Sequence, residues 1–146
     1  MKFSPAGYAL LKQSEGLRLE PYLDVAGFTT IGYGHKLNLS QGQGAPSEIT
    51  LADAEHLLTS DVLYAERVVT TLVHANLTQG QFDALVDFVF NLGPRRLADS
   101  TLLKDLNAGN FESAASQLLR WDHAGGKELS ALKARREAEF KLWHDV

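Results

Sequence analysis

The chain has 146 residues, of which 45% are hydrophobic and 22% charged, and its formal net charge is −4 at pH 7. This composition is that of an ordinary globular protein, so it excludes a wholly disordered chain, and the length suits one domain of ~100–150 residues. The absence of cysteine excludes disulfides, thiol catalysis and cysteine-ligated zinc. No stretch approaches the ~18 consecutive apolar residues of a membrane span. The N-terminal apolar run is too short for a secretory signal, so we expect neither a signal peptide nor a membrane anchor.

The first predicted element is a short helix over residues 4–15. Ser4 followed by Pro5 is a helix-start signal, because the hydroxyl can cap free N–H groups and proline is pre-set for the first turn. Gly16 is a natural helix stop.

A small β-region follows this helix. Apolar and polar residues alternate over residues 17–23, which indicates an extended segment bent at Pro21. Residues 26–35 contain a turn glycine and then β-branched and aromatic residues, which predicts the return strand of a hairpin. The glycine- and proline-containing residues 36–49 are typical of a loop.

Capping boxes open the two longest helices of the remaining sequence. Thr50 with Asp53 begins an apolar pattern that continues to Val69. Thr78 with Gln81 begins a second pattern, which ends at a Gly-Pro pair. The second helix is apolar over much of its circumference, so we expect it to run through the core.

Three shorter helices complete the chain. Ser100 starts one that ends near Gly109, and Asn110 is expected to cap the next. The last helix follows a break at Gly125-Gly126. Its expected apolar positions are Leu129, Leu132, Ala138 and Leu142. The pattern predicts an α+β, mainly α protein, with a β-lobe at about 16–49 and a helical lobe at about 50–146 that includes the N-terminal helix. A cleft between lobes is a usual place for a site.

The charge distribution leaves two interpretations open. The net charge of −4 argues against a nucleic-acid partner. Residues 120–136, however, carry five basic residues and two acidic ones. This basic stretch could dock an anionic partner, or it could be a solvated helix face.

Most kinds of catalytic site find no support in the sequence. The five histidines show no metal-ligand spacing, and neither a nucleophile elbow nor a phosphate-binding loop is present. We therefore expect no cofactor and no metal, and carboxylates remain as the candidate catalytic groups.

Glu15 and Asp24 are the first candidates. Glu15 lies at the expected helix end, where the partial negative charge of the helix disfavours an ionised carboxylate. Asp24 follows nine residues later, in a polar break. Glycoside hydrolysis needs two such carboxyl groups, but each residue alone also fits an ordinary surface or turn position.

The predicted return strand carries the next candidates. The Thr30 hydroxyl could hold a water molecule, although a threonine is unremarkable in a strand. Gly32 and Gly34 leave one strand face bare, which suits the close approach of a ligand or another chain. His35 and Asp61 could form a structural ion pair between the β-region and the long helix.

Two stretches of the sequence form a specific motif. They read E-G-L-R-L-E-P-Y-L-D from Glu15 to Asp24 and G-F-T-T-I-G-Y-G-H from Gly27 to His35. In residues and spacing they resemble the signature of the phage-type lysozymes, glycoside hydrolase family 24. Further matches are S-D-V around Asp61, F-N-L-G at 90–93, R-W at 120–121 and A-L-K-A-R-R-E-A-E-F-K-L-W near the end.

The resemblance implies a two-lobed lysozyme fold, with the lobes joined by a long helix, in a single domain over residues 1–146. It also implies cleavage of the β-1,4 bond between N-acetylmuramic acid and N-acetylglucosamine in bacterial cell walls. Glu15 matches the family's catalytic acid, Asp24 the second catalytic carboxylate, and Thr30 the threonine that helps to place water. By analogy the reaction inverts the anomeric centre, which predicts carboxyl groups ~6.5–9.5 Å apart.

The resemblance assigns further residues. His35 and Asp61 match a structural ion pair, and Arg135 or Arg136 matches an arginine that contacts the catalytic glutamate in the cleft. Substrate contacts are expected from these two arginines and from three more residues. Those three are Gly34, Phe90 and Asn91, and the cleft loop 39–46 is expected beside them.

The same resemblance implies bacterial peptidoglycan as the partner, with no nucleic acid, no membrane insertion and a monomeric protein. A phage enzyme of this kind is expected to stay in the host cytoplasm until it is released to the wall. Two other functions stay open: a lytic transglycosylase, which ends in an anhydro sugar, and a wall-binding module without turnover. Asp24 and Thr30 count against the first, and the complete catalytic set counts against the second. A purely structural helical domain would explain the core pattern but not the motif.

Overall fold

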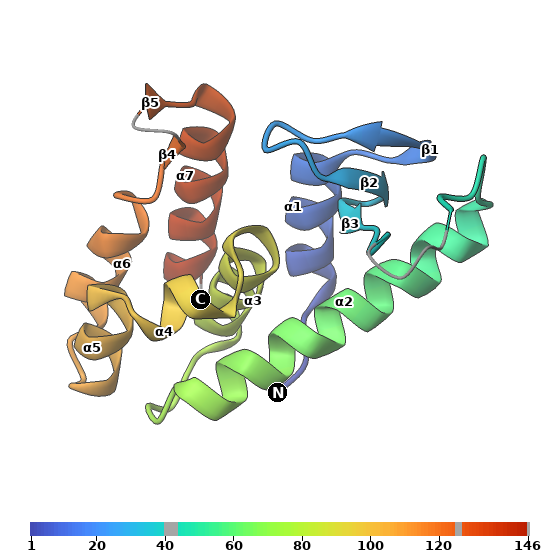
Figure 1. Ribbon diagram of the computed structural model, residues 1–146. Coiled ribbons are helices and arrows are strands. Elements are labelled where there is room, and N and C mark those ends of the chain that lie inside the picture. The colour runs from blue at the N-terminus through green and yellow to red at the C-terminus, as the bar shows by residue number, and fades with distance from the viewer. Residues whose placement is uncertain (40–43, 125–126, 146) are drawn as a thin grey trace. The chain divides into compact units, whose positions relative to one another are not determined.

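The computed structural model describes residues 1–39, 44–124 and 127–145 (Figure 1). Its helices are α1 (Pro5–Glu15), α2 (Leu51–Leu72), α3 (Gln79–Leu92), α4 (Pro94–Ala98), α5 (Thr101–Asn107), α6 (Phe111–Leu118) and α7 (Ser130–His144). Its strands are β1 (Arg18–Leu23), β2 (Thr29–Gly32), β3 (His35–Lys36), β4 (His123–Ala124) and β5 (Lys127–Glu128). The expected mainly α architecture with a small N-terminal sheet is confirmed.

The chain divides into two compact units. Residues 15–63 form the sheet unit, and residues 1–14 with 64–146 form the helical unit. Both predicted capping boxes are present. Thr50 and Asp53 exchange backbone-to-side-chain hydrogen bonds of 3.1 Å at the start of α2, and Thr78 and Gln81 do the same at the start of α3.

The sheet unit contains a three-stranded antiparallel sheet in the order β1-β2-β3. Tyr22 pairs with Thr30, and the pairing register shifts between Arg18 and Tyr22, the segment that contains Pro21. Proline has no N–H to donate to the ladder, which explains the irregularity. The single return strand expected over 26–35 is instead divided into β2 and β3, because the chain reverses after Gly32, where φ is +68°.

The core of the helical unit lies around α3. Eight consecutive residues, Phe82 to Val89, are buried, and α3 packs against α7 and α4. The glycine at the start of α3 permits this packing, since a Cβ atom on Gly80 would overlap the carbonyl oxygen of Leu142. The expectation that this helix runs through the core is confirmed.

Three local expectations differ from the structure. The pattern did not predict α4, a helix of five residues whose first position is Pro94. Asn110 precedes α6 but makes no side-chain cap hydrogen bond. His123–Ala124 and Lys127–Glu128 pair as the short antiparallel ladder β4-β5. The predicted break at Gly125-Gly126 lies outside the described residues, as do 40–43 of the predicted loop.

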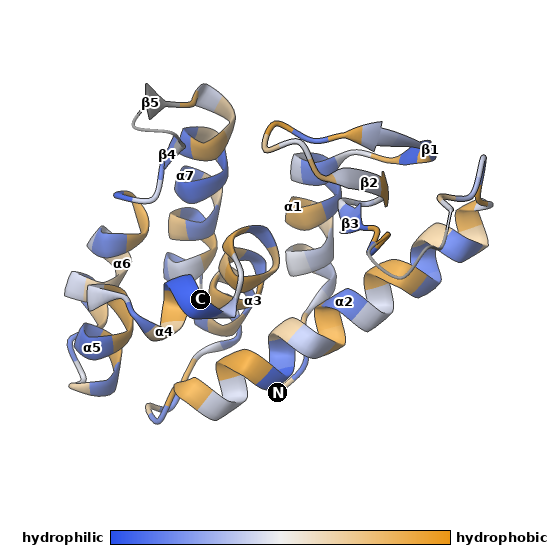
Figure 2. Cartoon of the chain, in the orientation of Figure 1, coloured by the Kyte–Doolittle hydropathy of each residue, from blue (hydrophilic) through white to orange (hydrophobic). Residues whose placement is uncertain are grey.

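The terminal helix α7 departs furthest from its predicted pattern. Figure 2 shows it as hydrophilic over much of its length. Its buried residues are Arg135, Arg136, Glu139 and Trp143. The leucines expected to mark its inner face are only half-buried. A hydropathy pattern could not find this face, because its buried charged side chains pair with Asp87 of α3 and with one another instead of with water.

In the part of the chain that the structure describes, no helix is both long enough and apolar enough to cross a bilayer.

Candidate active site

Glu15 is the last residue of α1, and the chain turns away immediately after it. Gly16 follows with a φ of +70°, a left-handed conformation that glycine adopts without strain. Gly34 also has a positive φ, and a Cβ atom built there would overlap the Glu15 carboxylate. The backbone of Gly34 therefore lies directly against the carboxylate of Glu15, which only a glycine permits.

Asp24 occupies the tight turn between β1 and β2. Its Oδ1 atom accepts hydrogen bonds from the N–H groups of Ala26, at 2.9 Å, and Phe28, at 2.8 Å. Such an Asx turn fixes the carboxylate relative to the strands. Within the described residues Oδ2 accepts no hydrogen bond, so this oxygen remains available for a ligand or water.

The backbone of Phe28 holds Asp24 and Thr30 together. Its carbonyl oxygen accepts from the N–H of Asp24 at 2.9 Å and from the Thr30 hydroxyl at 2.8 Å. Because that hydroxyl proton is already donated, the Thr30 oxygen can act towards a further partner only as an acceptor. Two acceptor oxygens, one from each residue, are therefore fixed by the same peptide segment.

Tyr22 lies within the electrostatic reach of both carboxylates. Burial, followed by the negative charges of Glu15 and Asp24, raises the pKa of Tyr22, and Arg18 opposes this effect. The Arg18 guanidinium lies 4.6 Å from the centre of the Tyr22 ring. Tyr22 therefore lies near enough to both candidate carboxylates for their charges to affect its pKa.

His35 and Asp61 form the pair expected between the β-region and the long helix. The Nδ1 atom of His35 lies 2.8 Å from Oδ2 of Asp61. The hydrogen bond to Asp61 raises the pKa of His35, and partial burial opposes it. The contact attaches β3 to α2 inside the sheet unit.

Arg135 belongs to a buried ion pair in the helical unit. Its Nε and Nη2 atoms donate to the two carboxylate oxygens of Asp87 at 2.9 and 2.8 Å, and Asp87 is fully buried. Burial is the largest influence and would raise the pKa of Asp87. The charges of Arg135 and Arg136 together with hydrogen bonds from Glu139 and Arg135 outweigh it, so the pKa is lowered. The pair joins α7 to α3.

Arg136 is fully buried beside it. It binds Glu139 at 2.8 Å through Nε and through Nη2, and Nη2 also donates to Oδ1 of Asn91 at 2.8 Å. Its guanidinium carbon lies 5.2 Å from the centre of the Phe88 ring. Since arginine only donates, the amide oxygen of Asn91 must face Arg136, which directs the Asn91 NH₂ group elsewhere.

The residues expected to bind substrate therefore fall in both units. Gly34 lies in the sheet unit with the catalytic candidates, while Phe90 and Asn91, both half-buried, lie on α3 with Arg135 and Arg136 buried next to that helix. The burial also changes the interpretation of the basic stretch at 120–136. Two of its five cations are buried in contact with carboxyl groups, so the stretch is not a fully solvated face, and these two arginines are not exposed for docking an anion.

Sequence reasoning missed Tyr22, Phe28 and Asp87. Residues in a strand alternate between faces, so the spacing of Tyr22 from Asp24 and of Phe28 from Thr30 was a usable signal. Asp87 offered none, because its importance depends on which residue of α7 packs against it.

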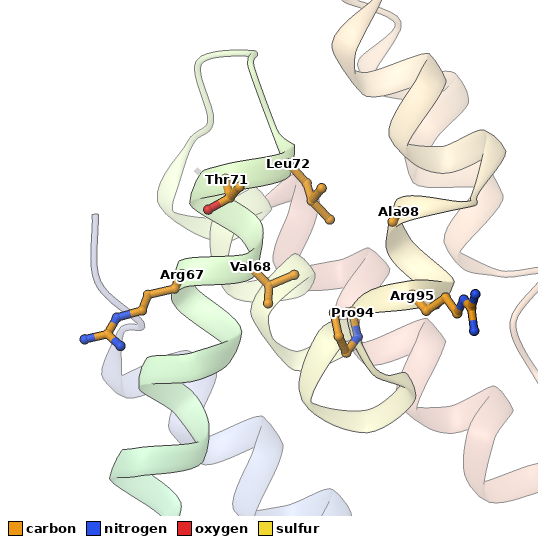
Figure 3. Close-up of a pocket in the computed structure, with 7 residues that line it drawn as sticks. All are labelled: Arg67, Val68, Thr71, Leu72, Pro94, Arg95 and Ala98. Atoms are coloured by element: carbon orange, nitrogen blue, oxygen red, sulfur yellow. The ribbon is translucent and has the colours of Figure 1, made fainter.

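The helical unit also contains an apolar pocket of about 440 Å³ (Figure 3). Val68 and Leu72 of α2 line it together with Pro94 and Ala98 of α4. The charged ends of Arg67 and Arg95 point away from it in Figure 3. No carboxylate lines this pocket, so it lacks the groups that glycoside hydrolysis requires.

Comparisons with known proteins agree with this geometry. A model of the family described as phage lysozyme matches residues 12–139. An endolysin of Acyrthosiphon pisum secondary endosymbiont phage 1 is 40% identical over 150 residues, covering all of both chains. An endolysin of Bacillus phage B103 is 43% identical over 145 residues, but the chain spans only 54% of that protein. Among solved structures, the muramidase domain of SpmX from Asticcacaulis excentricus superposes with a TM-score of 0.86 at 36% identity, covering 99% of both chains.

The fold and these comparisons define a lysozyme-type glycoside hydrolase. The chain belongs to the phage lysozyme family. It is accordingly a peptidoglycan-cleaving lysozyme of the endolysin kind.

Proposed function

We propose that Glu15, Asp24 and Thr30 carry out this hydrolysis by an inverting mechanism. Glu15 donates its proton to the glycosidic oxygen as the bond to the anomeric carbon breaks. A water molecule on the opposite face forms the new bond to that carbon and transfers a proton to Asp24. Exchange with solvent then returns both carboxyl groups to their starting states.

The arrangement around Phe28 is the observation that carries this proposal. The N–H of Phe28 donates a hydrogen bond to Oδ1 of Asp24, and its carbonyl oxygen accepts one from the Thr30 hydroxyl. A water held between Oδ2 and the Thr30 oxygen would donate both of its protons to them. Its lone pairs would then be free to attack carbon, which is the orientation an inverting hydrolase requires.

Mass spectrometry of sugars released from purified peptidoglycan tests the reaction. We expect fragments with free reducing N-acetylmuramic acid ends from the wild-type protein. Anhydro ends would assign the protein to the lytic transglycosylases, and no fragments from folded protein would make it a wall-binding module. The anomer released first, followed by NMR, distinguishes inversion from retention.

The substitution Glu15→Gln tests the role of Glu15 as the acid that protonates the glycosidic oxygen. It replaces the carboxyl group with a near-isostere that cannot donate the proton, so we expect turnover to fall by about 10²–10⁴-fold with an unchanged melting temperature. A variant that kept more than about a tenth of the wild-type rate would remove Glu15 from this role.

We also propose that five further residues contribute to substrate binding, Arg135 and Arg136 by supporting neighbouring groups. The other three are Gly34, Phe90 and Asn91.

We propose in addition that the protein acts as a monomeric single domain and that it reaches the wall from the host cytoplasm. Analytical ultracentrifugation and fractionation of host cells before lysis test these two statements.

A further inference from the structure

The hairpin between β1 and β2 exposes an aromatic ring next to the candidate catalytic residues. Phe28 is 54% exposed, yet its backbone makes the three hydrogen bonds that fix Asp24 and Thr30. An exposed apolar side chain alone needs no explanation. This ring differs because its backbone is fixed within hydrogen-bonding distance of both residues.

The strand register identifies the side of the sheet on which this ring lies. Directly paired residues share a face, and Thr30 pairs with Tyr22 on one side and with Lys36 on the other. The Nζ atom of Lys36 lies 4.5 Å from the centre of the Phe28 ring. Phe28 therefore belongs to the same face, which we call the Thr30 face and define by Tyr22, Phe28, Thr30 and Lys36.

Lys36 also fixes how the ring is presented. A cation over one face of an aromatic ring is an attractive contact, so it restricts rotation of the side chain. With one face in contact with Lys36 and the side chain half-exposed, the ring presents its remaining apolar surface to solvent. A flat apolar surface of this kind fits the C–H-bearing face of a pyranose ring.

We propose that Phe28 is a substrate-binding residue that stacks against a sugar ring of the glycan strand on the Thr30 face. This inference rests on the proposed function, because it places the sugar beside the carboxylate that handles water. Phe28 contributes binding and orientation but no proton transfer. Its loss should therefore raise KM and leave kcat nearly unchanged.

The hairpin offers a matched control. Leu23 is 70% exposed, and it pairs with Thr29, so it lies on the opposite face of the same two strands. Nonspecific hydrophobic binding of the glycan to the hairpin would depend on both Leu23 and Phe28. Stacking of a sugar ring on the Thr30 face depends on Phe28 alone.

The experiment compares wild type, Phe28→Ala, Phe28→Trp and Leu23→Ala on soluble uncross-linked glycan strands. We expect Phe28→Ala to raise KM by about three- to tenfold with kcat within about twofold. Phe28→Trp should restore KM, and Leu23→Ala should match wild type. An unchanged KM for Phe28→Ala, or an equal rise for Leu23→Ala, would overturn the proposal.

A second measurement does not depend on the folding of these variants. Tetra-N-acetylglucosamine is titrated into the Glu15→Gln protein while the ring protons of Phe28 are followed by NMR. Upfield shifts of the sugar C–H protons with matching changes in the Phe28 ring support stacking, and a saturating titration without them contradicts it. Failure of the proposed function would appear separately, as retained turnover in Glu15→Gln.

Discussion

Asp24 in the sheet unit and Asp87 in the helical unit are the same residue type in opposite environments. Asp24 is half-buried and is held by two backbone N–H groups that leave one oxygen available. Asp87 is fully buried, and both of its oxygens bind Arg135. The first arrangement fixes a carboxylate while keeping it reactive, and the second uses the carboxylate to neutralise a buried cation.

On the proposed mechanism, Asp24 takes part in the reaction, whereas Asp87 stabilises the fold. A buried charge without its partner is costly, so the Asp87–Arg135 pair cannot be used for proton transfer without destabilising the fold. Asp24 is held by backbone donors at a turn and has no buried cation as its partner, so its replacement leaves no buried charge exposed to this cost. The predictions below test this contrast, from the largest expected effect to the smallest.

Asp24→Asn should abolish most activity and leave the fold intact. The asparagine oxygen can still accept the N–H groups of Ala26 and Phe28, but the side chain can no longer take a proton from water. We expect turnover to fall by about 100-fold or more with little change in melting temperature. Full activity would exclude the proposed role, and a large loss of stability would break the contrast with Asp87.

Asp87→Asn should have the opposite effect and lower the free energy of unfolding by about 3–5 kcal/mol, because the buried Arg135 would lose its bidentate contact with a carboxylate. Chemical denaturation measures this change. The double variant Asp87→Leu with Arg135→Met should recover most of it, since neither member of the pair is then left buried without the other. If Asp87→Asn were as stable as the wild-type protein, the Asp87–Arg135 pair would contribute nothing to the free energy of unfolding.

Asp61→Asn tests the half-buried pair with His35. The hydrogen bond from Asp61 raises the pKa of His35 above its ordinary value of 6.5. The contribution to stability is therefore complete below about pH 6.5 and is lost as pH rises through the raised value. Over that pH range we expect the free energy of unfolding of the wild-type protein to fall by about 1 kcal/mol because of this pair. That of Asp61→Asn should show no such fall. If the free energy of unfolding changed with pH in the same way in both proteins, the proposed contribution of the His35–Asp61 pair to stability would be contradicted.

Glu112→Gln should have the smallest effect. Glu112 is 80% exposed in its contact with His144, with 3.1 Å between Oε2 and Nε2. Exposed pairs contribute little, so we expect the melting temperature to change by less than about 2 °C. A change as large as that of Asp87→Asn would show that exposure does not separate the two classes of carboxylate.

The sequence by itself determined the local elements and the identity of the catalytic candidates. Gly16 and the capping boxes at Thr50 and Thr78 act within a few residues of their own positions, so their effects are visible in the sequence. Glu15, Asp24 and Thr30 stand out by motif. Their spacing alone did not bring them together.

Only the tertiary structure decided how these residues are held and which charged groups are buried. Phe28 links Asp24 to Thr30 because the two strands pair in a particular register, and Asp87 meets Arg135 across 48 positions of the chain. Such contacts depend on which elements pack together, and hydropathy assigns arginine to the surface wherever it occurs. The sequence therefore left Arg135 and Arg136 as residues of a cleft or of a solvated helix face, and only the packing shows that both are buried, Arg135 against Asp87 and Arg136 against Glu139.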